Sequence, residues 1–408
     1  MKKILIDGRF IGVGDSMTRY TLEILNGVLK LDKENDYTLL IRPQGKKELA
    51  RYPEIEHASN LRLEVLDIPH YSLAEQSALL KYLSKEKFDL VHFIQFNHPL
   101  RYKKPYVVSI HDLTMYGHLH REKNPIKRLA FKAVMNSAVY DSTKIITISN
   151  TTKDDILDNF KVKPEKIEVT YLAVDPKFNV QARDQKSDIN KFKEKYKIQK
   201  NYFLYTGMWK KHKNILRMLK AFGKYVNDEF LISNDKENSR FHVPNIQLVL
   251  VGKIDKEEPE VTDEINRINS SLAVILGDRS ESKDLSLKPI ITTGFIDERE
   301  LPIAYAGALA YIIPSLSEGF GLPPLEAMAC GTPVISSKES CMPEILGNAA
   351  YYFDAYNIDD MADAMGKVVT SEDLRKELIE KGLKQAEKYS WEATAKKTLE
   401  VYHEALKV

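Results

Sequence analysis

The chain has 408 residues, of which 43% are hydrophobic and 29% charged, an ordinary globular composition and a length that suits two or three domains. Apolar runs such as 246–251 fall well short of the ~18 residues of a membrane-spanning helix, and Asp7 interrupts the apolar N-terminus too early for a signal peptide. The two cysteines, Cys330 and Cys341, cannot form a disulfide framework, and no Cys/His cluster has the spacing of a zinc site. We therefore expect a cytoplasmic protein of more than one domain.

The net charge of +2 is unevenly distributed along the chain. Residues 1–200 hold 35 Lys and Arg against 26 Asp and Glu, whereas residues 201–408 hold 25 against 32. This asymmetry indicates that the first half of the chain binds an anionic partner. Solvated lysines that cluster without a partner would give the same count, so both interpretations stay open.

The first half alternates short apolar runs with more polar, helix-like stretches. A helix is predicted over Arg19–Leu29, where Tyr20, Ile24, Leu25 and Val28 recur at helical spacing. Strands are predicted at Lys3–Asp7, Tyr37–Ile41, Asp89–Phe93, Tyr106–Ile110, Lys144–Ile148 and Ile167–Tyr171. Alternating strands and helices favour a parallel sheet with helices on both faces.

A polar stretch, Asn179–Lys200, interrupts this alternation before it restarts. The restart predicts a helix at Asn214–Tyr225 and an amphipathic terminal helix at Trp391–Leu406. Strands are predicted at Tyr202–Thr206, Gln247–Val251, Ile290–Thr293, Ala310–Pro314 and Pro333–Ser336. Two α/β domains follow from this pattern, and because ligands of such sheets bind beyond the carboxyl ends of the strands, we expect a cleft where the domains face each other.

In the segment 311–335, the positions of proline and glycine predict a strand, a loop and a helix in that order. The strand ends at Pro314, and prolines at 323 and 324 suit a first helical turn, where the N–H groups have no partners. Gly331 is placed to cap the end of this helix. The sequence therefore predicts a loop at residues 315–322 that runs into a helix N-terminus.

Two carboxylates flank that helix N-terminus. Glu318 begins the loop and Glu326 lies just inside the helix, while the amides of Phe320, Gly321 and Leu322 lie between them. A helix N-terminus favours anions, and carboxylates accept hydrogen bonds from the paired hydroxyls of a sugar or ribose. We expect this segment to bind a hydroxyl-rich, anionic ligand.

The whole segment resembles the donor-site signature of the retaining "group 1" glycosyltransferases with the GT-B fold. The match runs through Pro-Ser-x2-Glu-Gly-Phe-Gly-Leu-Pro-x-Leu-Glu-Ala-Met-Ala-x-Gly-x-Pro-Val, which is far more specific than a bare Glu-x7-Glu. The resemblance implies that Glu318 contacts the transferred sugar and that Glu326 binds the nucleotide ribose. It also implies that the amides of residues 320–322 hold the sugar or the diphosphate.

The same resemblance implies the domain organisation. Residues 1–180 would form a Rossmann-like acceptor domain, residues 181–200 a linker, and residues 201–388 a Rossmann-like domain for the nucleotide-sugar donor. In relatives the terminal helix, here residues 389–408, crosses back to the first domain.

A second match follows the strand at 202–206, in Gly207-Met-Trp-Lys-Lys211-His-Lys213-Asn. A glycine turn before a helix start makes an anion site, and the family segment Gly-x4-Arg-Lys-Asn implies that Lys213 binds the diphosphate. His212 and Met208 stand where relatives often carry arginine. Lys210 or Lys211 could substitute, and Lys211 is included as a further candidate ligand. Gly207 is included as a donor-site residue, as are Gly294 and Phe295, which lie in family register further along the chain.

The first domain contributes a third match at His111-Asp112-Leu, directly after a predicted strand. In the family this histidine faces the donor sugar, so we take His111 as catalytic together with Glu318 and Lys213. A lone histidine at a strand end is more often structural, and only the resemblance favours the catalytic interpretation. Asp112 and Gly14 are candidates for the acceptor side. Relatives place a glycine turn before the pair Arg19-Tyr20, where this chain has Ser16-Met17-Thr18.

The implied reaction transfers a hexose with retention of configuration and without metal or cofactor. The chain contains no Asp-x-Asp, so charge neutralisation would fall to Lys213 and helix amides. The donor would be GDP-mannose or another nucleotide-diphosphate hexose, and the acceptor a glycan or lipid-linked sugar in surface polysaccharide assembly. Alternatives are a non-catalytic cytoplasmic protein that binds sugar nucleotides and a GT-B epimerase.

A basic segment at 121–132 could bring the first domain to an anionic membrane surface. It carries five basic residues and one acid, interleaved with Ile126 and Leu129. A solvated basic helix with a core-facing apolar side explains the same pattern. Nucleic acid is not an expected partner, and a peripheral location at the inner face of the cell membrane remains an expectation.

Overall fold

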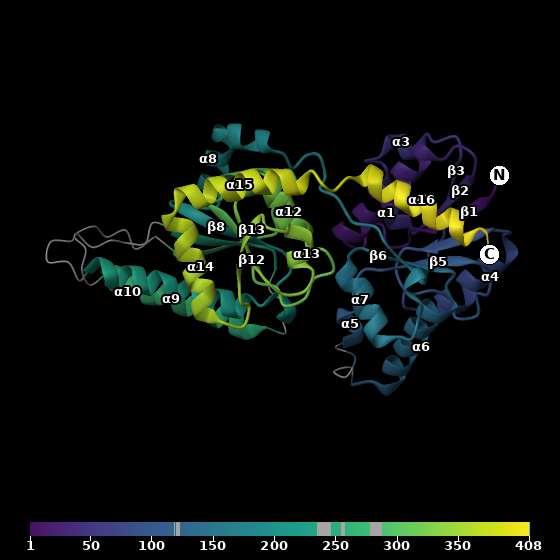
Figure 1. The fold of residues 1–408 in the computed structure, drawn as a ribbon, viewed down its shortest axis with the longest axis horizontal. Helices are drawn as coiled ribbons and strands as arrows, with labels where there is room; N and C mark the ends of the chain where they lie inside the picture. Colours follow the sequence, from purple (N-terminus) through teal and green to yellow (C-terminus); the bar gives the residue numbers. More distant parts are fainter. Residues whose placement is uncertain (118, 120–122, 235–245, 254–257, 278–287, 408) are drawn as a thin grey trace. The chain divides into compact units, whose positions relative to one another are not determined.

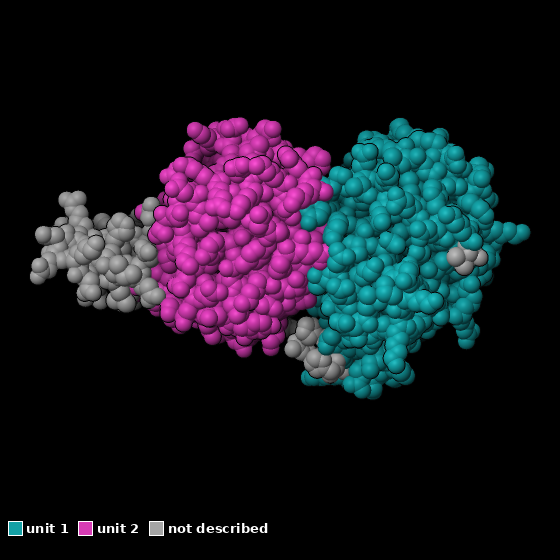
Figure 2. All heavy atoms as spheres, viewed as in Figure 1, with its two compact units in different colours: residues 1–173, 389–408 teal, residues 174–388 magenta. Residues whose placement is uncertain are grey.

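The computed structural model of the protein describes residues 1–117, 119, 123–234, 246–253, 258–277 and 288–407. The chain divides into two compact units (Figure 2). Unit 1 comprises Met1–Ala173 and Tyr389–Val408, and unit 2 comprises Val174–Lys388. Each unit is built on one parallel sheet with helices around it (Figure 1), so the predicted GT-B class of two doubly wound domains is confirmed.

The sheet of unit 1 has the order β3-β2-β1-β4-β5-β6-β7, with every pair parallel. All residues of β4 and β5 are buried, as expected for parallel strands covered on both faces. The strands are β1 (Lys3–Asp7), β2 (Asp36–Ile41), β3 (Leu61–Val65), β4 (Leu90–Phe93), β5 (Tyr106–Ile110), β6 (Lys144–Thr147) and β7 (Ile167–Val169).

The helices of unit 1 include one from the far end of the chain. They are α1 (Asp15–Leu31), η1 (Pro43–Gly45), α2 (Lys46–Leu49), α3 (Pro53–Glu56), η2 (Glu75–Leu79), α4 (Leu80–Lys85), α5 (Thr114–Gly117), α6 (Pro125–Asp141), α7 (Asn150–Asn159), η4 (Pro164–Lys166) and α16 (Trp391–Ala405). Helix α16 packs on α1 so closely that a Cβ at Gly27 would lie 2.4 Å from the Ala395 Cβ. The buried face of α16 contains Ala395, Leu399 and Tyr402, which is the amphipathic face expected from the sequence.

The sheet of unit 2 has the order β10-β9-β8-β11-β12-β13, again parallel throughout. Its strands are β8 (Asn201–Thr206), β9 (Ile246–Val251), β10 (Ile290–Gly294), β11 (Ala310–Ile313), β12 (Val334–Ser337) and β13 (Ala350–Phe353). Its helices are η5 (Val180–Asp184), α8 (Lys186–Lys195), η6 (Lys211–Lys213), α9 (Ile215–Asn234), α10 (Pro259–Gly277), α11 (Leu301–Gly307), α12 (Leu322–Ala329), α13 (Met342–Leu346), α14 (Ile358–Thr370) and α15 (Glu372–Ala386).

Residues 181–200, expected as a linker, belong to unit 2 and form η5 and α8. The Arg183 guanidinium donates to the Gly331 carbonyl, and Lys195 pairs with Glu300 at 2.8 Å. Phe192 of α8 is buried. The many charged residues of this stretch suggested a linker. In the structure most of them are exposed, and a few contacts fix the stretch to unit 2.

The edge strands β3 and β13 were not predicted. Both lie at the end of their sheet, and neither is buried along its whole length. The sequence of β3, Leu-Arg-Leu-Glu-Val, lacks the continuous apolar run that marks the central strands, whereas β13, Ala-Tyr-Tyr-Phe, is a short apolar run that was not identified as a strand. Among the described helices, none combines the length and apolar character needed to cross a bilayer.

Candidate functional site

The strand order of unit 2 reverses between β8 and β11, since β9 and β10 continue to one side and β12 and β13 to the other. Ligands of open parallel sheets bind outside the carboxyl ends of the strands at such a point. Both predicted donor segments start here, one after Thr206 and one after Ile313. They run side by side, because the Leu316 amide donates to the His212 carbonyl at 2.8 Å.

Lys213 is held at this edge by the residue that follows it. Asn214 has a left-handed backbone with φ of +58°, which ends η6 before α9 begins. Its side-chain amide donates to the Pro314 carbonyl at 3.1 Å and to the Ala355 carbonyl at 2.8 Å. Asn214 thus ties the Lys213 loop to the loop after β11.

Lys213 and Glu318 form an ion pair. Lys213 Nζ lies 2.6 Å from Glu318 Oε1 and 2.7 Å from Oε2, and the Ser315 hydroxyl donates to Oε1 at 2.8 Å. The backbone of Glu318 is clamped by Ser340, whose hydroxyl accepts from the Glu318 amide at 3.2 Å and donates to its carbonyl at 2.9 Å. The side chains of the pair are 22% and 15% exposed, so solvent still reaches them.

Helix α12 begins at Leu322, one residue before Pro323, the first of the two prolines at which the sequence predicted the helix start. Gly321 precedes it with φ of +86°, and a Cβ at that position would lie 2.4 Å from Met342 Cε, so glycine is favoured on both grounds. No side chain caps the first turn of α12. Phe320 is buried and anchors the loop. The arrangement leaves the positive end of the helix dipole available to an anion.

Glu326 is buried in the first turns of α12 and is 6% exposed. Tyr305 donates to its Oε2 at 3.0 Å, and the Tyr305 hydroxyl also lies 3.0 Å from Thr206 Oγ1 at the end of β8. Burial, and then the charge of Glu326, raise the pKa of Tyr305 well above its ordinary value. The phenol therefore remains a donor and fixes the carboxylate.

No sequence pattern indicated this role for Tyr305. It lies on α11 among buried apolar neighbours, and such a pattern predicts a core tyrosine.

The glycines expected in the donor site lie where strands end. Gly207 has φ of +140°. Its carbonyl oxygen lies 2.0 Å from the position that a Cβ at Gly252 would occupy, so the backbones of the two glycines are too close for a side chain at Gly252. The Gly252 amide donates to the Gly294 carbonyl at 2.9 Å, and Gly294 has φ of +70°. Phe295, which follows, is 70% exposed.

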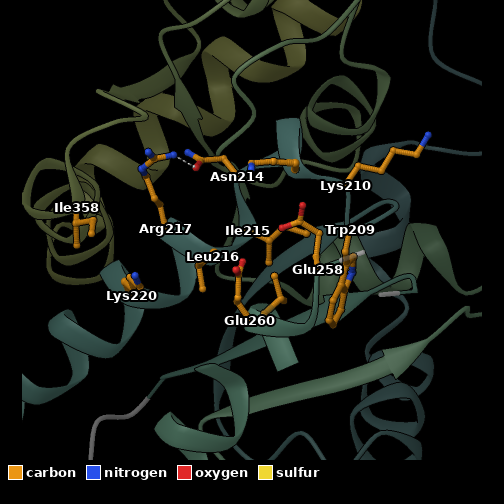
Figure 3. A pocket seen from close by; sticks show the side chains of 12 residues that line it. Trp209, Lys210, Asn214, Ile215, Leu216, Arg217, Lys220, Glu258, Glu260 and Ile358 are labelled. Carbon is orange, nitrogen blue, oxygen red and sulfur yellow. Dashed lines mark hydrogen bonds between the residues drawn. The ribbon is translucent and has the colours of Figure 1, made fainter. Parts of the chain in front are cut away.

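Lys211 belongs to the same short helix η6 as Lys213 but lines a pocket that Lys213 does not. It lines a pocket between the beginnings of α9 and α10, together with Trp209, Arg217 and Glu258 (Figure 3). Neither Lys213 nor Glu318 lines this pocket. The structure thus associates Lys211 with a different group of side chains, and its donor-binding role stays a prediction.

His111 follows β5 in unit 1. Its Nε2 lies 3.0 Å from the Ile94 carbonyl oxygen, and the Tyr20 ring meets it edge-on at a centroid distance of 4.6 Å. Because a carbonyl only accepts, Nε2 carries the ring proton. Burial lowers the pKa of His111, so the neutral ring presents Nδ1 as a hydrogen-bond acceptor.

A buried chain of hydrogen bonds lies beside His111. Ser109 Oγ lies 2.8 Å from both Tyr20 Oη and His92 Nε2, and His92 Nδ1 lies 2.7 Å from Tyr402 Oη on α16. Burial lowers the pKa of His92 to about 3, so the ring stays neutral. These residues position the strand end that carries His111. The residues of this hydrogen-bonded chain lie too far apart in the sequence for a local pattern to reveal their contacts.

The two acceptor-side candidates have local structural roles. Asp112 Oδ1 accepts from the Thr114 amide at 2.8 Å, where α5 begins. Gly14 precedes α1 in an extended conformation with φ of −176°, and a Cβ there would meet nothing within 4 Å. Within the described part of the chain, no three His, Cys, Asp or Glu side chains are grouped as metal ligands would be.

Two family models match the chain. The model described as "Glycosyl transferases group 1" matches residues 186–385, and "Glycosyltransferase Family 4" matches residues 17–178. The first match contains Lys213, Glu318 and Glu326, and the second contains His111.

Individual proteins are similar over three quarters or more of the chain. O-antigen chain mannosyltransferase B of Escherichia coli is 25% identical over 398 residues, with 94% of each chain covered. O-antigen chain mannosyltransferase RfbU of Salmonella typhimurium is 28% identical over 322 residues, covering 76% of this chain and 74% of the relative. The structure of Anabaena HepE in complex with UDP and glucose superposes with a TM-score of 0.67 at 15% identity, covering 99% of this chain and all of HepE.

Proposed function

Because the chain belongs to the group 1 glycosyltransferases, we propose that it transfers a hexose from a nucleotide-diphosphate sugar to a glycan or lipid-linked acceptor. The similar O-antigen mannosyltransferases favour GDP-mannose as the donor and a growing surface polysaccharide as the acceptor. The observation that carries the proposal is the Lys213–Glu318 pair at the carboxyl edge of β8 and β11, beside the uncapped start of α12.

This edge has the charges that a departing nucleotide diphosphate needs. Negative charge grows on the diphosphate as the bond to the sugar breaks, and a fixed ammonium stabilises that charge in the transition state. Lys213 supplies the ammonium and the N-terminus of α12 supplies a second positive end. We propose that these groups suffice, so that transfer proceeds without a divalent metal ion or another cofactor.

In this proposal each of two carboxylates binds a different part of the donor. Glu326 accepts hydrogen bonds from the ribose hydroxyls, held in place by Tyr305. Glu318 contacts the transferred hexose, and its pairing with Lys213 keeps sugar and diphosphate in a fixed relation. His111 of unit 1 accepts a hydrogen bond from a sugar hydroxyl at Nδ1, because Nε2 is already bound to the Ile94 carbonyl.

The proposed reaction retains the configuration of the donor. The bond from the anomeric carbon to the diphosphate oxygen breaks as the acceptor oxygen approaches from the same face. The acceptor proton passes to that diphosphate oxygen, so no protein base is needed. Ser315 and Lys213 already bind the carboxylate of Glu318, which favours a positioning and charge-stabilising role for this side chain.

We also propose an anionic membrane surface as a partner, through the N-terminal part of α6. Ile126 and Leu129 are 78% and 70% exposed, and Lys127 and Arg128 beside them are exposed as well. Exposed apolar side chains among cations suit an anionic lipid surface. Residues 121 and 122 of the predicted basic segment lie outside the described residues.

A screen of nucleotide sugars tests the proposed function. The full chain is incubated with GDP-mannose, UDP-glucose or dTDP-rhamnose, and release of the free nucleotide is followed with and without glycan acceptors. We expect nucleotide release from GDP-mannose, and its loss in Lys213→Ala while the circular dichroism spectrum is unchanged. Release from none of the donors would contradict the proposal, whereas release from another donor would correct the sugar alone.

A further inference from the structure

The ring of His111 is oriented by a residue that the sheet itself does not fix. His111 Nε2 donates to the Ile94 carbonyl at 3.0 Å, which leaves Nδ1 as the acceptor that the proposed function uses. Ile94 lies one residue beyond Phe93, the last residue of β4 that pairs with either neighbouring strand. The direction of the Ile94 carbonyl therefore depends on the residues that follow β4, which we call the β4 loop, residues 94–100.

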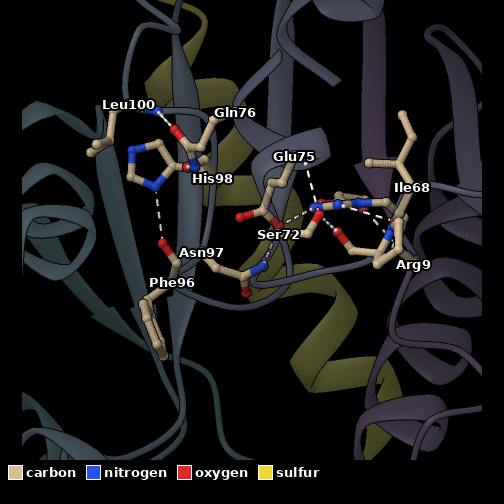
Figure 4. Close-up of polar contacts among 11 residues, drawn as sticks. Arg9, Ile68, Ser72, Glu75, Gln76, Phe96, Asn97, His98 and Leu100 are labelled. Carbon is tan, nitrogen blue, oxygen red and sulfur yellow. Dashed lines mark hydrogen bonds and ion pairs between the residues drawn. The ribbon is translucent and has the colours of Figure 1, made fainter. Parts of the chain in front are cut away.

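Two consecutive residues of η2 hold the β4 loop (Figure 4). Gln76 Nε2 donates to the His98 carbonyl at 2.9 Å, and the Leu100 amide donates to Gln76 Oε1 at 2.9 Å. Glu75 Oε2 accepts from Asn97 Nδ2 at 2.6 Å. Gln76 thus binds the backbone of the loop at two positions, through both ends of its amide, and Glu75 binds a side chain between them in the loop.

Glu75 is in turn fixed to the end of β1. Arg9 Nη2 lies 2.9 Å from Glu75 Oε2 and 2.7 Å from Asp7 Oδ2, and Arg9 Nε donates to Asp7 Oδ1 at 2.8 Å. Arg9 is 0% exposed, and Asp7 and Glu75 are buried as well. Separating buried charges of this kind is strongly unfavourable, so η2 is held firmly against the sheet.

The turn that supplies these contacts is itself unusual. η2 is a π-helical turn that continues directly into α4, and such turns are rare and occur frequently at functional sites. The polar groups of Glu75 and Gln76 are directed to the β4 loop, whereas the Ser77 hydroxyl donates to the Leu73 carbonyl one turn earlier in the same helix. η2 therefore connects the buried charges at the end of β1 with the loop that carries Ile94.

We propose that Gln76 is a positioning residue for His111. Its amide fixes the β4 loop, the loop fixes the Ile94 carbonyl, and this carbonyl holds the His111 ring with Nε2 as the donor and Nδ1 as the acceptor. Gln76 contacts no substrate in this scheme and acts through His111. The inference rests on the proposed function for the role of His111 in transfer, whereas its effect on the ring is measured without any substrate.

NMR of the full chain with isotope-labelled histidine tests the positioning directly. A ring N–H that donates to a buried carbonyl exchanges slowly with water, so His111 Nε2–H should give a signal in the wild type that is missing in His111→Gln. Gln76→Met keeps the length of the side chain but removes both hydrogen bonds, and this proton should then exchange about tenfold faster. Ser77→Ala, on the same turn, is the matched control and should leave the exchange rate unchanged.

Kinetics with GDP-mannose test whether the effect reaches the reaction. Gln76→Met should lower kcat about tenfold and leave the Kd for GDP unchanged, because the proposed nucleotide contacts, Lys213 and Glu326, belong to unit 2. In a His111→Gln background the same substitution should lower kcat no further, since Gln76 acts through His111.

Two results would overturn the inference. One is an exchange rate of His111 Nε2–H that is the same in Gln76→Met and in the wild type, and the other is a further loss of kcat when Gln76→Met is added to His111→Gln. Absence of turnover in the wild type would instead contradict the proposed function, and the exchange rate would still decide whether Gln76 positions His111.

Discussion

Lys213 Nζ lies between the two carboxylate oxygens of Glu318, at 2.6 and 2.7 Å, although 105 residues separate them in the sequence. The two loops that carry them leave neighbouring strands at the point where the sheet order reverses. The carboxylate fixes the position of the ammonium. In the function proposed above, the pair thereby connects the sugar end of the donor with its charged end.

Replacing Lys213 should slow the transfer step. Lys213→Ala removes the ammonium, and we expect kcat to fall by about 10²- to 10³-fold, as when one transition-state donor is lost. Steady-state kinetics with GDP-mannose give the value. Lys384→Ala is the control, because Lys384 is an exposed lysine on α15 of the same unit, and its kcat should match that of the wild type. Equal kcat in Lys213→Ala would contradict the assignment.

Removing Glu326 should weaken nucleotide binding through the ribose. Because hydrogen bonds to a charged group contribute about 1.5–3 kcal/mol, Glu326→Ala should raise the Kd for GDP about 10- to 100-fold in isothermal titration calorimetry. A nucleotide without ribose hydroxyls, 2′,3′-dideoxy-GDP, should bind wild type and variant alike. If the variant loses affinity for that analogue as well, Glu326 acts on the fold and not on the ribose.

The close passage of Gly207 and Gly252 predicts a large effect on stability. Gly252→Ala places a Cβ 2.0 Å from the Gly207 carbonyl oxygen at φ of +124°. We expect the free energy of unfolding to drop by about 3 kcal/mol or more, seen as a lower Tm. Gly14→Ala, with φ of −176° and open space around the Cβ, should leave Tm unchanged. Similar Tm values for the two variants would refute this reading of the loop.

The buried His92 predicts a pH dependence of stability. Its folded pKa of about 3 lies below the ~6.5 of an unfolded histidine, so both states are neutral above pH 6.5. Between pH 6.5 and 3 the unfolded state binds one more proton, and stability falls by up to ~1.4 kcal/mol for each pH unit. Urea unfolding at pH 7 and pH 5 should show a smaller loss for His92→Gln than for the wild type, and an equal loss would rule this origin out.

The start of α6 should govern binding to anionic lipid. Replacing both Ile126 and Leu129 with Asp should abolish flotation with anionic vesicles at low salt, since it removes exposed apolar area and adds repulsion. Leu31→Asp, at an exposed position at the end of α1, serves as the control. If the wild type does not float with the vesicles, the proposed binding to an anionic membrane is wrong.

Most of the sheet could be predicted from the sequence because central parallel strands are continuous apolar runs. The start of α12 was predicted within one residue, since prolines in a first helical turn are a local signal. The edge strand β3 lacks such a run, and the charged surface of α8 obscured the few contacts that fix it to unit 2.

The residues that support the site could not be predicted in the same way. Tyr305 reaches Glu326 from another helix, Ser340 clamps the backbone of Glu318 from beyond β12, and Tyr402 meets His92 across 310 residues. Each contact depends on tertiary packing, which no local spacing encodes. The roles of the site residues themselves were predicted from the family resemblance and not from any local pattern.

The most direct test of the central claim is proton NMR of the first product formed from GDP-α-D-mannose and a glycan acceptor in the presence of EDTA. We predict that the new glycosidic bond is α and that the rate equals the rate measured with added Mg²⁺ or Mn²⁺. A β-linked product, or turnover that stops with the chelator and returns with the metal, would contradict a retaining reaction supported by Lys213 and the start of α12.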